Sequence, residues 1–118
     1  MDTVVLGASL NSERYSNKAV KSLLKHGHKV YPVGIKKGEI EGISILNDYP
    51  ALENIDTVTL YLNPEKQNEV KDYIFSLHPR RIIFNPGAEN ADLEKEAIAK
   101  GIVATEACTL VLLSIGAF

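Results

Sequence analysis

The chain has 118 residues, a formal net charge of −2, 45% hydrophobic residues and 24% charged residues, which predicts one ordinary globular domain over residues 1–118. So small a charge gives no electrostatic reason to expect nucleic acid or an anionic membrane surface as a partner. No apolar run approaches the roughly 18 residues of a membrane span, no basic and apolar leader opens the chain, and the single cysteine, Cys108, cannot form a disulfide within it. We therefore expect a cytoplasmic protein.

The first third of the chain predicts a strand, a helix and a second strand. Val4 to Leu6 is a continuous apolar run, typical of an interior strand in a parallel sheet. After Ser16, apolar residues recur at helical spacing and end at Gly27, which predicts an amphipathic helix. Residues 29–33 predict the second strand, in which Pro32 indicates a strand end or a bulge. Residues 35–54 are expected to be mostly connection, with at most a small strand or turn over 43–46.

The rest of the chain alternates strands and helices. Residues 57–62, rich in β-branched and aromatic side chains, form the clearest strand, and Asn63 with Pro64 predicts the start of a helix that reaches His78. A strand over 81–84, a turn over 85–87, a helix that begins after Asn90 and ends at Gly101, a strand over 102–104 and a helix over 109–115 follow. This order predicts an α/β fold: a three-layer Rossmann-like sandwich around a five-stranded parallel sheet.

The carboxyl ends of the predicted strands form the expected ligand edge, because open parallel sheets bind ligands there. Gly7-Ala8-Ser9 joins the first strand to the first helix, and unpaired N–H groups with the helix dipole favour a phosphate at such a junction. The binding residues predicted along this edge are Gly7, Ala8, Ser9, Ser12, Arg14, Val33, Gly34, Lys36, Asn63, Pro64, Asn85 and Gly87.

The motifs that would specify NAD are absent. Ser9 and Ser12 stand where the second and third glycines of G-x-G-x-x-G would be. The second predicted strand is followed by Lys36 and Lys37, with no carboxylate before Glu39, whereas enzymes that bind the NAD ribose place an acidic residue there. These features favour a ligand that carries an additional phosphate at its adenosine end.

The sequence also resembles a known family. Residues 7–20 (GASLNSERYSNKAV), Leu24 and residues 27–33 (GHKVYPV) look like the opening of the small stand-alone CoA-binding proteins, which are similar to the CoA-binding domain of the succinyl-CoA synthetase α subunit. Residues 40–42 fall at the family's turn glycine, 56–62 match its central strand, and 87–101 match its late loop and helix. Cys108, two residues after Glu106, stands where the family commonly has Asp-x-Cys. The resemblance implies a Rossmann-type fold with CoA or an acyl-CoA as ligand.

Three stretches depart from the family pattern. Gly34-Ile35 replaces the usual Asn-Pro after the second strand, and residues 85–87 (NPG) replace a Gln-x-Gly. Residues 62–64 (LNP) stand where the family has Phe-Arg-Pro-Pro, so the arginine of that stretch, a charge contact with the ligand, has no counterpart here.

Our hypothesis is a non-catalytic module that binds CoA or an acyl-CoA, with the pyrophosphate over the loop from Gly7 to Ser9 and the pantetheine arm near Asn63 and Gly87. Two alternatives stay open: an oxidoreductase or transferase subunit that uses NAD(P) or another nucleotide, and an interaction subunit that kept the fold and lost the ligand. The three histidines have no second ligand at metal spacing, so no metal is expected. The sequence also leaves open a homo-oligomer and whether the thiol of Cys108 is reactive.

Overall fold

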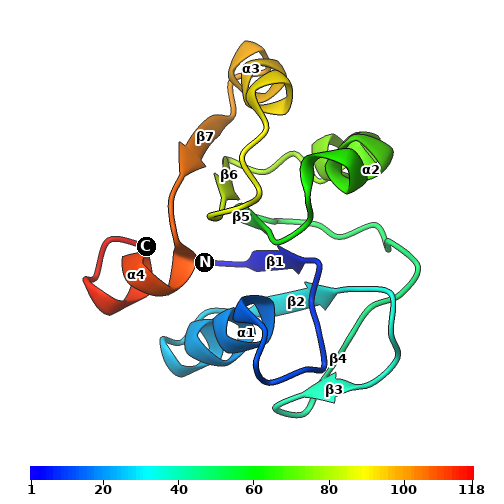
Figure 1. Ribbon diagram of the computed structural model, residues 1–118, viewed down its shortest axis with the longest axis vertical. Helices are drawn as coiled ribbons and strands as arrows, with labels where there is room; N and C mark the ends of the chain where they lie inside the picture. Colours follow the sequence, from blue (N-terminus) through cyan, green and yellow to red (C-terminus); the bar gives the residue numbers. More distant parts are fainter.

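A computed structural model describes residues 1–118 and places a parallel sheet between two pairs of helices (Figure 1). The sheet has the strand order β2-β1-β5-β6-β7, and β3 and β4 form a separate hairpin. These findings confirm the predicted α/β sandwich. In chain order the elements are β1 (Thr3–Leu6), α1 (Tyr15–Lys25), β2 (Val30–Val33), β3 (Glu39–Ile40), β4 (Ile43–Ser44), β5 (Thr57–Leu60), α2 (Pro64–Ser76), β6 (Arg81–Phe84), α3 (Ala91–Ala99), β7 (Val103–Glu106) and α4 (Thr109–Ser114).

The sheet separates two apolar cores because successive side chains of a strand point to opposite faces. Val4 of β1 packs in one core together with Leu93 of α3. Val5, the next residue, packs in the other core with Leu23 of α1 and Leu113 of α4. Helices α1 and α4 therefore cover one face, and α2 and α3 cover the other (Figure 1). The winding reverses between β1 and β5, so a crevice is expected at the carboxyl ends of these two strands.

Strand β2 lies at one edge of the sheet, which explains how it accommodates Pro32. The Pro32 carbonyl accepts a hydrogen bond from Leu46 N at 2.8 Å, on the side away from β1, so the missing N–H of proline breaks no pairing with β1. The segment predicted as mostly connection contains the hairpin of β3 and β4, and Glu39–Ile40 was not predicted as a strand. The hairpin turns at Glu41 and Gly42, both with positive φ (51° and 79°).

The helix starts agree with the sequence prediction in α2 and α3 but not in α1. The side chain of Asn63 accepts from Lys66 N at 2.9 Å, and that of Asn90 accepts from Leu93 N at 3.2 Å. These hydrogen bonds confirm both predicted caps. Helix α1 instead begins at Tyr15, earlier than predicted, and Arg14 at its N-cap makes no side-chain capping hydrogen bond.

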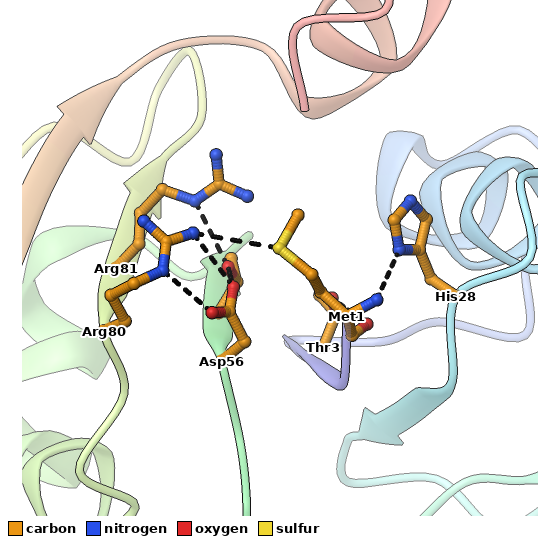
Figure 2. A network of polar contacts seen from close by, with 7 residues as sticks. Met1, Thr3, His28, Asp56, Arg80 and Arg81 are labelled. Atoms are coloured by element: carbon orange, nitrogen blue, oxygen red, sulfur yellow. Dashed lines mark hydrogen bonds and ion pairs between the residues drawn. The ribbon is translucent and has the colours of Figure 1, made fainter.

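A polar network lies at the amino ends of the strands, on the edge of the sheet opposite the crevice (Figure 2). Arg80 donates to both carboxylate oxygens of Asp56, at 2.8 and 3.1 Å, and this contact holds the pKa of Asp56 below its ordinary value. The amino group of Met1 lies 2.9 Å from His28 Nδ1. Burial and the neighbouring positive charge of the amino group lower the pKa of His28. Neither pair of residues lines the crevice, so the network lies apart from the expected ligand edge.

None of the four helices is long and apolar enough to cross a membrane.

Candidate functional site

A cavity of about 560 Å³ lies at the carboxyl ends of β1, β2 and β5, where the winding of the sheet reverses. Its walls come from four parts of the chain: the loop after β1 with the first turn of α1, the segment that follows β2, residues 61–62 with the beginning of α2, and Pro86 after β6. This volume lies within the range of cavities that bind small molecules and cofactors. The topology therefore places a cavity at the edge that the sequence indicated.

The structure brings seven of the twelve predicted binding residues to this cavity. They come from two strand ends that are neighbours in the sheet, and they are Gly7, Ala8, Ser9, Arg14, Val33, Gly34 and Lys36. The other five residues, Ser12, Asn63, Pro64, Asn85 and Gly87, do not line it. A contact between any of the twelve and a ligand stays a prediction.

Two glycines let the backbone segments of the cavity floor approach each other closely. Gly7 has a φ of 95°, and a Cβ there would lie 3.0 Å from Leu62 Cδ2 and 3.1 Å from the Tyr61 carbonyl carbon. A Cβ at Gly34 would lie only 2.4 Å from the Ala8 carbonyl oxygen. Because that neighbour is backbone rather than a flexible side chain, only glycine fits at position 34 without displacement of the β1 loop.

The backbone N–H groups of Gly7 and Ala8 are already used within the protein. Both donate to the Val33 carbonyl oxygen, each at 2.9 Å, and so join the β1 loop to the end of β2. In contrast, the N–H groups of Ser9, Leu10, Tyr15 and Ser16 donate to no protein acceptor, although all four residues line the cavity. The free donors therefore lie at Ser9 and Leu10 and in the first turn of α1, beyond the glycine that first indicated a phosphate site.

Polar side chains at the cavity carry a net positive charge. Arg14, Lys36 and Lys66 line it, against a single carboxylate, Glu69, which lies 3.4 Å from Lys66. Ser16 also lines the cavity although only 3% of its surface is exposed, and its hydroxyl makes no hydrogen bond with another protein group. Neither Ser16 nor Lys66 was among the predicted residues.

Exposed apolar side chains gather at the same cavity. Four of them line it, with between 40% and 85% of the surface of each residue exposed: Leu10, Tyr15, Ile35 and Tyr49. Large apolar residues left in solvent next to a cavity are typical of a surface that a ligand covers. The cavity thus offers cations and free N–H groups for an anion and apolar surface for the rest of a ligand.

Asn85, one of the predicted binding residues, is only 2% exposed and its amide is engaged inside the protein. Its Nδ2 donates to Thr59 Oγ1 at 2.6 Å and to the Leu60 carbonyl at 2.9 Å, and its Oδ1 accepts from Thr109 N at 2.9 Å. These bonds join the carboxyl ends of β5 and β6 to the start of α4. Asn85 therefore stabilises the packing of β5, β6 and α4 beneath the cavity.

Tyr61 follows β5 and lines the cavity with a half-buried side chain whose hydroxyl oxygen is buried. Burial raises the pKa of its hydroxyl to about 12, so the hydroxyl keeps its proton at neutral pH. Its oxygen has no hydrogen-bond partner. Tyr61 can therefore donate a hydrogen bond but cannot act as a base.

Comparisons with known proteins agree with this geometry. Residues 2–114 match the model of a family described as the CoA binding domain, whereas no curated protein matches. A solved structure of an uncharacterized protein is 49% identical, with a TM-score of 0.97 over 99% of this chain and 97% of that one. A hypothetical protein from Pyrococcus horikoshii OT3 is 27% identical, with a TM-score of 0.77 over 93% of this chain and 80% of that one.

A larger enzyme shares the fold alone. The dinucleotide-forming acetyl-coenzyme A synthetase 1 of Ca. Korarchaeum cryptofilum, solved in complex with phosphate and ADP, is 20% identical, with a TM-score of 0.72. The similarity covers 90% of this chain and 25% of the synthetase. The family match over nearly the whole chain, together with a cavity at the strand ends, shows that this protein belongs to the CoA-binding domain family.

Proposed function

We propose that the cavity binds CoA or an acyl-CoA and that the protein acts as a non-catalytic binding module. The observation that carries the proposal is the amino end of α1, an 11-residue helix whose first turn has no side-chain cap and lines the cavity. The N-termini of α2 and α3 differ, because asparagine side chains already accept from their first turns. Family membership supplies the class of ligand.

The first turn of α1 has the donors that a pyrophosphate requires. The N–H groups of Tyr15 and Ser16 lack protein acceptors, the Ser16 hydroxyl is free, and Arg14 adds a full positive charge. The helix dipole places a further partial positive charge at this end. The proposal therefore puts the pyrophosphate over the loop after β1 and the start of α1.

The two ends of the ligand extend from this point in opposite directions. Lys36 follows β2, where a cation favours an additional phosphate on the adenosine, and the apolar side chains of Ile35 and Tyr49 lie at the same cavity. The pantetheine arm runs across the ends of β5 and β6, near Asn63 and Gly87. Pro86 supports this direction, because it lines the cavity directly before Gly87.

The ionisable groups at the cavity suit binding rather than turnover. Tyr61 holds its proton because its pKa is raised to about 12, and the carboxylate of Glu69 lies beside Lys66. The proposal therefore expects acyl-CoA to be recovered unchanged after incubation with the protein. Release of free thiol at a rate proportional to protein concentration would contradict the non-catalytic part of the proposal.

A ligand panel tests the binding. We expect CoA and acetyl-CoA to raise the melting temperature, with a stabilisation of about 2.7 kcal/mol at a hundredfold excess over Kd. A response to NADP or NAD but not to CoA would favour the oxidoreductase or transferase alternative. No response to any of CoA, acetyl-CoA, NAD, NADP and ADP at millimolar concentration would favour an interaction subunit.

A pair of serine variants tests the position of the phosphates. Ser16→Ala removes the free hydroxyl at the cavity and should weaken CoA binding about tenfold, as expected for a hydrogen bond to a charged group. Ser114→Ala is the matched control, since that hydroxyl donates to the Val111 carbonyl of its own helix, away from the cavity. Equal CoA affinity in the two variants would refute the placement at the start of α1.

A further inference from the structure

Asn17 is a buried polar residue of α1, and its side chain makes a hydrogen bond to the loop after β1. Only 3% of its surface is exposed, and its Nδ2 donates to the Ser9 carbonyl oxygen at 2.8 Å. Its Oδ1 is buried with no hydrogen-bond partner. A buried amide oxygen without a partner costs free energy. Because the amide oxygen of Asn17 is unpaired, the side chain contributes to the structure through one hydrogen bond, from Nδ2 to the Ser9 carbonyl.

That hydrogen bond determines the orientation of the next N–H group. A peptide unit is planar and trans, so the carbonyl of Ser9 and the N–H of Leu10 point in opposite directions. Because the carbonyl is held toward buried Asn17, the Leu10 N–H is directed away from it. Leu10 lines the cavity, and its N–H has no protein acceptor.

The surrounding contacts leave Leu10 in a defined position. A Cβ at Gly38 would lie 2.6 Å from Leu10 Cδ2, so the leucine side chain packs closely against the segment that follows β2. Farther along the loop, Ser9 Oγ accepts from Asn11 N at 3.1 Å and Asn11 Oδ1 accepts from Glu13 N at 2.9 Å. The side chains of Ser9 and Asn11 thus accept from the N–H groups of Asn11 and Glu13, whereas the N–H of Leu10 is left for a ligand.

We infer that Asn17 is a positioning residue, which holds the Ser9–Leu10 peptide so that the Leu10 N–H donates to a phosphate oxygen of the bound ligand. The inference rests on the proposed function, because it assigns one donor of the same anion site. The N–H groups of Gly7 and Ala8 are not available for the same role, since the Val33 carbonyl accepts from both.

Two substitutions of Asn17 remove the donor in different ways. Asn17→Asp keeps the shape of the side chain but places a carboxylate beside the Ser9 carbonyl oxygen, and Asn17→Ala removes the donor without adding charge. Both should weaken binding of CoA and of inorganic pyrophosphate about 10- to 100-fold. The matched control is Asn90→Asp, a buried position at the start of α3 whose carboxylate can still accept from Leu93 N and which does not line the cavity.

The amide resonance of Leu10 separates positioning from a general loss of stability. In the wild-type protein, inorganic pyrophosphate should shift the Leu10 amide in an NMR titration. In both Asn17 variants the Leu10 amide should move already in the free protein and respond no further, while Asn90→Asp should behave like the wild type. Folded Asn17 variants with wild-type Kd and a responsive Leu10 amide would overturn the inference.

The wild-type measurements alone also distinguish the inference from the proposed function. If CoA binds and the Leu10 amide is unmoved by CoA and pyrophosphate, Asn17 does not position a phosphate donor and only the inference fails. If the Leu10 amide responds to pyrophosphate but CoA does not bind, the CoA assignment fails and the phosphate contact of the Leu10 N–H stands. A wild-type protein with neither response refutes both.

Discussion

Replacement of Gly34 by alanine adds one methyl group where two backbone segments touch. Gly34 is the one glycine in the chain without a positive φ, so the substitution introduces no conformational strain of its own. The new Cβ would lie 2.4 Å from the Ala8 carbonyl oxygen, and contacts shorter than 3.0 Å are essentially never seen for a Cβ. The β1 loop and the end of β2 must therefore separate by about 0.6 Å, the difference between 3.0 and 2.4 Å.

The cost of this separation follows from the contacts that it disturbs. Overpacking of a well-packed site costs about 1–3 kcal/mol. Two hydrogen bonds span the same junction, from Gly7 N and Ala8 N to the Val33 carbonyl, each 2.9 Å long. Both should weaken, and each contributes about 0.5–1.5 kcal/mol to stability. We expect Gly34→Ala to lose about 2–4 kcal/mol of unfolding free energy in total.

Urea unfolding and CoA titration of Gly34→Ala test the reasoning together. The variant should unfold at lower urea and bind CoA more weakly, because Ser9 and Leu10 move with the loop. The control is Gly101→Ala, where nothing lies within 4 Å of the new Cβ and the φ of 78° alone disfavours alanine. It should lose about 1–2 kcal/mol and keep its CoA affinity. Wild-type stability in Gly34→Ala would refute the claim that this close approach requires glycine.

Four further predictions concern the scaffold. Asn85→Ala should destabilise the protein by about 2–4 kcal/mol in urea unfolding, because buried hydrogen-bond partners in β5 and α4 are left unpaired; a loss below 1 kcal/mol would show that the network is dispensable. Asn63→Ala should cost about 1 kcal/mol through loss of the cap of α2, and a neutral result would contradict that role. Because burial lowers the pKa of His28, the unfolded chain binds its proton more readily, so stability should fall as the pH drops below 6.5. His28→Gln should flatten this dependence, and an unchanged pH profile would exclude His28 as its source. The carboxyl of Asp56, whose pKa is lowered by Arg80, should add a further loss below pH 3.8.

The elements of the sheet could be predicted from the sequence because each strand is a short apolar run with a distinct boundary. Arg81–Phe84 was predicted with both ends correct, and the boundaries elsewhere shifted by one or two residues, as at Leu60 and Val103. The strand Glu39–Ile40 could not be predicted, since two residues carry no periodicity. Its turn uses Glu41 in a positive-φ conformation that glutamate rarely adopts.

The candidate site was predicted less completely, and the start of α1 shows why. Apolar periodicity begins only after Ser16, so the helix was expected there and Ser16 and Asn17 received no role in binding. The structure begins the helix at Tyr15, which puts Ser16 at the cavity and Asn17 against the loop. The sequence also does not reveal which N–H groups already donate to acceptors within the protein. The N–H groups of Gly7 and Ala8 donate to the Val33 carbonyl, a tertiary contact that no local pattern predicts.

The separation of the two apolar cores by the sheet has a consequence for how the protein tolerates change. The apolar core that contains Leu93 and the one that contains Leu23 have no residue in common, so substitutions on opposite faces should combine additively. The two layers can therefore be redesigned one at a time.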